Sequence, residues 1–406
     1  MKDLKLSQRP LFYCGFRPFF TLTCLSALLF MGLWLSYSLG WISLWQIPGG
    51  WLVWHAHELI FGFASAAIAG FVLTAIPEFT QTPALSPRLS LCLSSVWLGA
   101  RLAYFSSGLV SLYPALILNL VFWLILLRYI TPPVWQFSRK KQLSFPLSLL
   151  AIALLQVVFF SQLLMNKNAL IWLYSCVHLL MILIIVATSR ISMSVMNNKV
   201  ENKDDTTTDL VYIARPPLRY LAITSIIICA IAELIFGTSA ITGWLSLAAM
   251  AAVFNLLNDW HIGKALFSRF ALMLYSSYWL MALGYGLLGL AYLKAPILPS
   301  TGRHLLTVGA MTVSIFTVLN IVSRIHSGLW LDRRIWLPCA VLLLIAATIS
   351  RALAGFVSYL AYFQTWILLA GILWLAVFSL YAIYVLPILW RKREDALCGC
   401  EEPSHH

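Results

Sequence analysis

The chain has 406 residues, of which 61% are hydrophobic and 10% are charged, and its mean hydropathy is +0.87. A soluble domain is nearer to half apolar and a quarter charged, so this composition excludes one and predicts a helical protein that crosses a membrane many times. The net charge of +13 does not indicate nucleic acid as a partner, because basic residues in a membrane protein mostly mark its cytoplasmic loops.

Twelve apolar segments are long enough to span a bilayer, which needs roughly 20 residues. In chain order they are 19–39, 51–76, 89–107, 109–130, 145–165, 169–189, 218–237, 241–257, 267–291, 303–325, 336–358 and 362–389. If the N-terminus is cytoplasmic, the outer segments carry only Lys167, Lys294 and Arg303, and the other basic residues outside the spans fall on the inner side. The positive-inside rule therefore predicts an all-α polytopic membrane protein with about twelve transmembrane helices and both termini cytoplasmic.

The sizeable inner loop, 191–217, is polar and of mixed charge. It divides the chain into six spans plus six, with no sequence repeat between the halves. We predict one integral membrane domain, 1–406, made of the halves 1–190 and 218–390 with a tail at 391–406. The 6+6 layout invites comparison with transporters, but that is an analogy of fold alone.

Most of the eight cysteines lie in apolar runs, where they act as small hydrophobic residues. Cys398 and Cys400 form the close pair. With His405 and His406 they would suit a soft metal, but we favour a disordered tail.

The stretch Trp51–Thr80, which contains the second span, carries His55, His57 and Glu58 in its first turns. Membrane helices rarely hold ionisable groups without a functional reason. The alternative is that the histidines only anchor the helix end among the lipid headgroups, and we favour a functional site. Small residues recur further along at positions 62, 66 and 70, so we expect another helix to pack on that face.

His55 and His57 are about 200° apart around a regular helix, because each residue turns about 100°. They cannot easily bind one ion together, whereas His55 and Glu58 share a face. Either the helix begins irregularly at Trp54 or the two histidines serve different partners.

Arg101 and Arg351 lie within the third and eleventh spans, where a buried arginine needs an anionic partner. Both fall in the outer halves of their helices, as do Glu58, Glu233 and His304. Such a cluster is typical of a cofactor or substrate cavity. The alternative is a set of internal ion pairs that join Glu58 or Glu233 to Arg101 or Arg351.

Two further histidines lie at other depths. His178 is near the middle of the sixth span, where an imidazole either forms hydrogen bonds with a neighbour or ligates a metal. His326 lies at the inner end of the tenth span.

The chain resembles the NnrS family of bacterial membrane proteins. The specific matches are Gly15-Phe16-Arg17-Pro18-Phe19-Phe20 and Trp54-His55-Ala56-His57-Glu58. Looser matches are Phe61-Gly62-Phe63, Ala69-Gly70-Phe71, Trp97-Leu98-Gly99-Ala100-Arg101, Arg190-Ile191, His304 to Ala310, Arg324, Arg351 and Tyr384 to Leu389. The resemblance implies a multi-pass protein of the bacterial inner (cytoplasmic) membrane. It also implies bound haem and copper and a role in nitric oxide metabolism, denitrification or protection from nitrosative stress.

The resemblance implies that histidines bind the cofactors, and the matching positions are His55, His57 and His304. From its depth in the sixth span we add His178 to the cofactor-binding set, with Arg17, Arg101 and Arg351 as cationic partners of haem propionates. The metal set is His55, His57, Glu58, His304 and His326. The chain departs from the family pattern where Tyr275 and Leu329 stand in place of histidines, so a ligand is displaced or lost there.

Other functions fit parts of the pattern. A secondary transporter of a small anion or a metal ion would use the same charged cluster in the outer half of the membrane. An oxidase-like enzyme is disfavoured, because its reaction centre needs about six histidines in the membrane, and this chain has fewer and no adjacent pair. An assembly role without bound metal stays open. The expected partners are the lipid bilayer and nitric oxide or a related small molecule, and no residue pattern identifies an electron donor.

Overall fold

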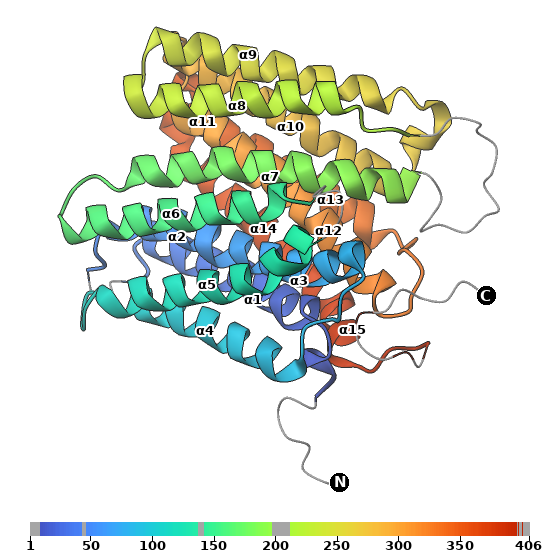
Figure 1. Ribbon diagram of the computed structural model, residues 1–406. Helices are drawn as coiled ribbons and strands as arrows, with labels where there is room; N and C mark the ends of the chain where they lie inside the picture. Colours follow the sequence, from blue (N-terminus) through green and yellow to red (C-terminus); the bar gives the residue numbers. More distant parts are fainter. Residues whose placement is uncertain are drawn as a thin grey trace. The chain divides into compact units, whose positions relative to one another are not determined.

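The computed structural model describes residues 9–42, 46–136, 142–196, 212–395, 397 and 400. Helices make up the regular structure of these residues, and the β-pairing within them is one isolated bridge between Ile297 and Phe356 (Figure 1). Within these residues, eleven helices are long and apolar enough to cross a membrane. The prediction of an all-α polytopic membrane protein is confirmed.

The helices correspond to the predicted spans. The first part of the chain forms η2 (Pro10–Phe12), α1 (Phe16–Ser38), α2 (Gly50–His57), η3 (Glu58–Ala64), α3 (Ser65–Thr80), α4 (Pro87–Phe105), α5 (Tyr113–Gln136), α6 (Ser144–Leu164) and α7 (Leu170–Met196). The middle part forms α8 (Pro216–Phe236), α9 (Ala240–Leu256), η5 (Leu257–Trp260), η6 (Gly263–Phe267) and α10 (Arg269–Tyr292). The last part forms α11 (Pro299–His304), η7 (Leu305–Met311), α12 (Thr312–Ile325), α13 (Trp336–Leu353), η8 (Val357–Tyr362), α14 (Phe363–Tyr384) and α15 (Leu386–Trp390).

The helix α4 corresponds to the third predicted span but is less apolar than the eleven. Its 19 residues include Arg88, Arg101 and three serines. The polar side chains Ser90, Ser94 and Arg101 are buried against the protein. Packing inside the protein therefore explains why this helix needs less apolar surface than its neighbours.

The chain forms two compact units. The first unit contains residues 1–176, 318–330 and 378–406, and the second contains 177–317 and 331–377. The end of the chain belongs to the first unit, so this division does not follow the predicted halves 1–190 and 218–390. The prediction of one integral membrane domain stays a prediction.

In the first unit, α1 packs against the small-residue face of η3 and α3. A Cβ atom on Gly70 would lie 2.6 Å from the Phe20 ring, and one on Gly62 would lie 2.6 Å from the Phe30 ring. Ala66, between them, is fully buried. The small face therefore receives another helix, as predicted. In the same unit α5 packs between α4 and α6 (Figure 1).

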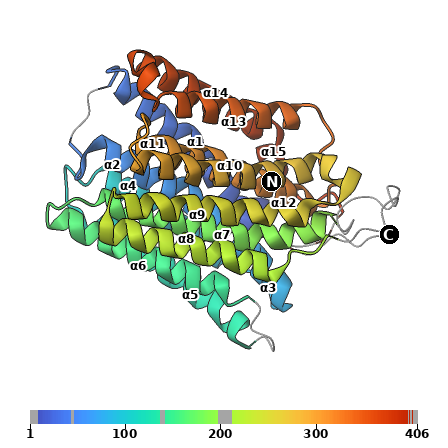
Figure 2. The same ribbon diagram turned by 90° about the horizontal axis from the view of Figure 1, so that it is seen from above.

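In the second unit, α9 packs against both α8 and α10, and α8 and α9 lie side by side in both views (Figures 1 and 2). Close contact again depends on glycine. A Cβ atom on Gly289 would lie 2.8 Å from the Gly243 carbonyl oxygen, and one on Gly302 would lie 2.5 Å from the Leu288 backbone nitrogen. The backbones of α9, α10 and α11 are thus held together at van der Waals distance.

Two spans contain a π-helical segment of seven residues, which the sequence did not predict. The segment η3 follows α2 directly after His57, and η7 follows α11 directly after His304. A π-helical turn holds more residues than an α-helical turn, so it changes which side chains face a neighbouring helix, and such turns are frequent at functional sites.

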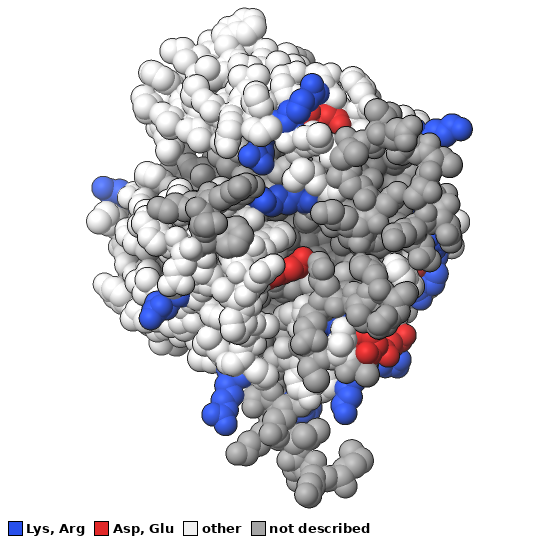
Figure 3. Space-filling view, turned by 45° about the vertical axis from the view of Figure 1, so that its right-hand side comes forward, with Lys and Arg blue, Asp and Glu red and all other residues white. Residues whose placement is uncertain are grey.

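Large apolar side chains are exposed along many of these helices, for example Leu29, Leu102, Ile235 and Leu342. Broad areas of the surface carry neither acidic nor basic side chains (Figure 3). Both features are expected where lipid tails replace water around the protein.

Candidate functional site

The first candidate site is built around His57, the last residue of α2. Its side chain is fully buried. Aromatic rings surround it at centre-to-centre distances between 4.6 and 5.3 Å: Phe61, Tyr104, Phe159 and Phe160. Helix α2 is regular from Gly50 to His57, so the predicted irregular start at Trp54 is wrong.

Neighbouring groups assign one tautomer to His57. The Trp123 indole can only donate a hydrogen bond, and it donates to Oε1 of Gln156 at 2.5 Å. The amide nitrogen of Gln156 therefore donates to Asn119 Oδ1 at 2.9 Å and faces His57 Nε2 at 3.2 Å. His57 Nε2 must accept, so Nδ1 carries the proton and donates to Glu58 Oε1 at 2.9 Å.

An ion pair completes this cluster. Glu58 Oε2 lies 3.6 Å from Nη1 of Arg101, and both side chains are almost completely buried. Arg101 also donates through Nη2 to Asn119 Oδ1, while its Nε has no acceptor among the described residues. The predicted alternative of an internal ion pair is therefore correct for Glu58 and Arg101. We refer to His57, Glu58, Arg101, Asn119, Trp123 and Gln156 as the first cluster.

The second unit contains a similar cluster around Glu233 of α8. Its Oε1 accepts from Arg303 Nη2 at 2.5 Å and from the Tyr292 hydroxyl, and its Oε2 lies 2.8 Å from His178 Nε2. The other nitrogen of His178, Nδ1, lies 2.9 Å from the Tyr285 hydroxyl. We refer to His178, Glu233, Tyr285, Tyr292 and Arg303 as the second cluster.

The partner of Glu233 differs from the prediction, which named Arg101 or Arg351. The structure pairs it with Arg303, a residue that the sequence assigned to an outer loop boundary. The reason is that α11 begins at Pro299, before the predicted start of the tenth span at residue 303. Proline is favoured at the first position of a helix, and Arg303 therefore lies within the helix rather than at its first residue.

His55 has a different environment from His57. Its ring stacks on Trp34 with 4.3 Å between ring centres and an angle of 20°. The two histidines therefore serve different partners, which was the second of the predicted alternatives.

His304 and Arg351 lie in the second unit on α11 and α13, which pack against each other. His304 Nδ1 donates to the Ser300 carbonyl oxygen at 2.7 Å, so in the neutral ring Nε2 is the nitrogen without a proton. Nη1 of Arg351 is buried and has no hydrogen-bond partner among the described residues. A buried cationic donor of this kind is suited to an anionic group of a ligand.

Arg17 and His326 contribute to a separate region of the first unit. Arg17 Nη1 donates to the carbonyl oxygens of Leu389 at 3.0 Å and Arg391 at 2.5 Å, so it caps the end of α15. The Arg17 guanidinium therefore has a structural role at the end of α15, where these two carbonyl oxygens accept its hydrogen bonds.

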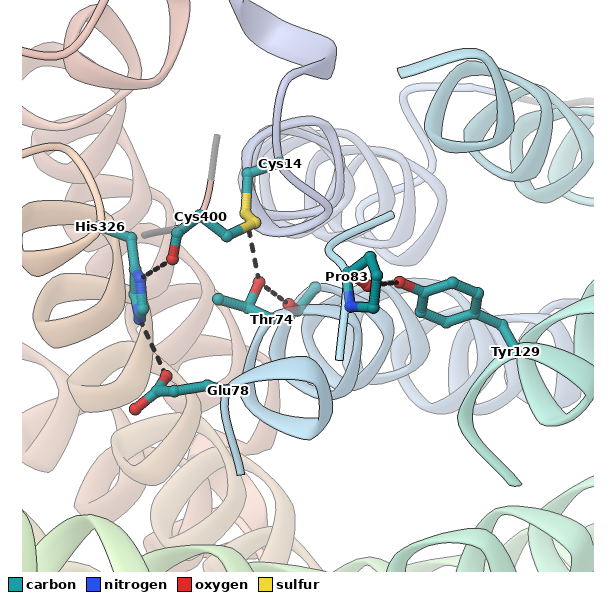
Figure 4. The surroundings of a disulfide bond; sticks show 8 residues. Cys14, Thr74, Glu78, Pro83, Tyr129, His326 and Cys400 are labelled. Carbon is teal, nitrogen blue, oxygen red and sulfur yellow. Dashed lines mark hydrogen bonds and ion pairs between the residues drawn. A yellow bond between two sulfur atoms is a disulfide. The ribbon is translucent and has the colours of Figure 1, made fainter. Parts of the chain in front are cut away.

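His326 lies beside a disulfide bond between Cys14 and Cys400 (Figure 4). Its Nδ1 donates to the Cys400 carbonyl oxygen at 3.1 Å, and its Nε2 lies 3.5 Å from Glu78. The prediction of a disordered tail is wrong for Cys400, while Cys398, His405 and His406 lie outside the described residues. Near this tail, a hydrogen bond from Arg393 lowers the pKa of the Asp395 carboxyl.

Within the described part of the chain, no group of three or more His, Cys, Asp or Glu side chains is arranged to hold a metal ion. The predicted metal set, His55, His57, Glu58, His304 and His326, therefore stays a prediction as a binding site.

Sequence reasoning missed five residues that determine how the histidines behave: Asn119, Trp123, Gln156, Tyr285 and Tyr292. The signal that would have found two of them is the presence of Asn119 and Gln156 within apolar spans, because a buried amide needs hydrogen-bond partners. The tyrosines carry no such signal, since tyrosine is common at membrane interfaces.

Comparison with known proteins gives a match over nearly the whole chain. The family model described as NnrS protein matches residues 10–393. A search of curated proteins gave no match.

Proposed function

The chain belongs to the NnrS family, and on that premise we propose that it binds haem within the membrane and acts in nitric oxide metabolism or in protection from nitrosative stress. It is a multi-pass membrane protein of a family related to nitric oxide. The bacterial inner membrane is the location that this family and the basic inner loops favour.

The hydrogen bond from His304 Nδ1 to the Ser300 carbonyl carries the proposal. Histidines that ligate a metal usually donate their other ring N–H to a carbonyl or carboxylate, which fixes the tautomer and the ring orientation. His304 has this arrangement with Nε2 as the ligand atom. Arg351, on the adjacent helix α13, would place its buried guanidinium near a propionate.

His57 and His178 do not fit the role of ligand. Both ring nitrogens of His57 are engaged, by Glu58 and Gln156, and both of His178 are engaged, by Glu233 and Tyr285. Either residue would have to break a buried hydrogen bond before it could bind iron. We therefore propose that His304 would hold the haem iron and keep His55 as the remaining candidate.

When bound, a haem supplies an iron centre whose free coordination position can take a small diatomic molecule. The protein would hold the ring and exclude water. Copper fits less well, because the described residues hold no cluster of three suitable ligands. Copper is implied by the resemblance alone.

The test is the visible spectrum of the purified protein from cells with ample haem, first oxidised and then reduced with dithionite. We expect a Soret band that shifts on reduction. His304→Ala should lower the haem content per protein more than tenfold, Arg351→Gln should lower it less, and His57→Gln, the control, should leave it unchanged in the folded fraction.

Haem lost from His57→Gln but retained by His304→Ala would contradict the assignment. The absence of a Soret band from the wild-type chain would contradict haem binding itself.

A transporter of a small anion or a metal ion is the second candidate. The two π-helical segments are compatible with it, because each one lies next to an ionisable residue within a span, and π-helical turns are frequent at functional sites. Uptake of a labelled anion or metal ion by vesicles that contain the protein, in a chain without haem, would favour this candidate.

A further inference from the structure

The two clusters contain the same three ionisable residue types, but their histidines differ in what they can do with a proton. His57 accepts a hydrogen bond at Nε2 from an amide N–H of Gln156. A proton added to Nε2 would bring the N–H of His57 against the N–H of Gln156, and neither group can accept a hydrogen bond from the other. Relief would need the Gln156 amide to turn over, which would break its bond from the Trp123 indole. His57 is therefore confined to its neutral form.

His178 has no such restriction. Its Nε2 faces the Glu233 carboxylate, which can only accept, so Nε2 carries a proton. Its Nδ1 faces the Tyr285 hydroxyl, which can either donate or accept by rotating one hydrogen. Nδ1 can therefore take up a proton and lose it again with no movement of any heavy atom.

The charges around His178 permit this change. The groups that face the histidine and its carboxylate are Glu233 and Cys229 on α8, Tyr285 and Tyr292 on α10, and Arg303 on α11. Glu233 and Arg303 form a neutral pair, with 15% of the Arg303 side chain exposed. A proton on His178 adds one positive charge beside the Glu233 oxygen at 2.8 Å, and this carboxylate offsets part of the cost of burying the charge.

We propose that His178 is a reversible proton acceptor inside the membrane, with Glu233 as its counter-ion and Tyr285 as its switchable hydrogen-bond partner. Because these two residues occupy both ring nitrogens, a proton reaches or leaves the imidazole through one of them. Such a group can deliver a proton to a reaction in the second unit. The proposal does not depend on haem binding.

The test is solid-state ¹⁵N NMR of the full-length, histidine-labelled protein in lipid vesicles, between about pH 5 and pH 9, the range around the usual titration of histidine. The expected result is an imidazole signal that changes reversibly from neutral to doubly protonated and is absent from His178→Gln. The signal absent from His57→Gln, the matched control, should stay in the neutral Nδ1–H form throughout.

Tyr285→Phe provides a second test that retains the histidine. It removes the acceptor of the added proton, so the ratio of protonated to neutral His178 at a given pH should fall about tenfold, which corresponds to one pH unit. This variant also identifies the His178 signal if His178→Gln fails to accumulate. A His178 signal that stays constant with pH would overturn the proposal, and so would a His57 signal that titrates in the wild-type protein.

Discussion

The first and second clusters each contain a histidine, a glutamate and an arginine, yet the residues around them give these trios different properties. In the first cluster, His57 lies next to an amide that an indole N–H holds in one orientation. In the second, His178 lies next to a tyrosine hydroxyl. The Arg101 side chain is 4% exposed, while that of Arg303 is 15% exposed. The hydrogen bonds of the first cluster fix His57 in its neutral form, whereas those of the second allow His178 to take up a proton, and the arginine of the second cluster is the more exposed of the two.

The comparison teaches that an intramembrane histidine cannot be assigned a role from its residue type and depth. Neighbours that can only donate, such as tryptophan and arginine, propagate one hydrogen-bond pattern through a network. A neighbour that can either donate or accept, such as a tyrosine hydroxyl, leaves the direction of the hydrogen bond undetermined. Substitutions in and around the two clusters test whether this difference holds.

Removal of the arginine should lower the free energy of unfolding much more in the first cluster than in the second. Arg101→Ala leaves the buried Glu58 carboxylate without its cation, so we expect the free energy of unfolding to fall by about 3–5 kcal/mol. Arg303→Ala should cost about 1–2 kcal/mol, because Tyr292 and His178 still donate to Glu233. Thermal unfolding of the detergent-solubilised protein measures both.

The double variant Glu58→Gln with Arg101→Met is the control, because it removes both charges. It should recover part of the stability that Arg101→Ala loses. Equal losses for Arg101→Ala and Arg303→Ala would show that burial does not distinguish the two clusters.

Glycine substitutions compare the helix contacts of the two units. Gly302→Ala would place a Cβ atom against the Leu288 backbone of α10, which cannot move aside, so we expect a loss near the upper end of about 1–3 kcal/mol. In Gly70→Ala the new Cβ atom meets the Phe20 ring, which can turn, so the loss should lie near the lower end of this range. The same unfolding measurement ranks them, and the reverse order would show that the α10–α11 contact is the more adaptable one.

Much of this contrast was accessible from the sequence. The spans follow from hydropathy, and the small face at Gly62 and Gly70 follows from residue size. The cost of a buried charge indicated ion pairs as one alternative, but it left open whether Glu58 or Glu233 pairs with Arg101 or Arg351. The pairing of Glu233 with Arg303 did not follow, because it depends on where α11 begins. The π-helical segments and the bond between Cys14 and Cys400 were also missed. A π turn leaves no periodic pattern in a uniformly apolar run, and residues 386 positions apart carry no pairing signal in a single sequence.

A change at Trp123 should release the lock on His57. Trp123→Phe leaves Gln156 Oε1 without its donor, so we expect a loss of about 1–3 kcal/mol in the free energy of unfolding. The amide can then present its oxygen to His57 at the cost of one hydrogen bond, from its N–H to Asn119 Oδ1, instead of two. The ¹⁵N signal of His57 should begin to titrate in this variant, and a signal that stays neutral would mean that burial, rather than the amide, keeps His57 uncharged.

The corresponding change in the second cluster should have the smallest effect on stability. Tyr285→Phe removes a hydroxyl whose partner, His178 Nδ1, can remain a neutral acceptor, so we expect a loss of about 1 kcal/mol. The ring itself still fills its place against the imidazole, since phenylalanine keeps the stacked contact at 5.6 Å between ring centres. If Tyr285→Phe instead costs as much as Trp123→Phe, the hydroxyl must hold His178 in one tautomer as firmly as Gln156 holds His57. The second cluster would then be locked as well, and the difference between the clusters would reduce to the exposure of Arg303.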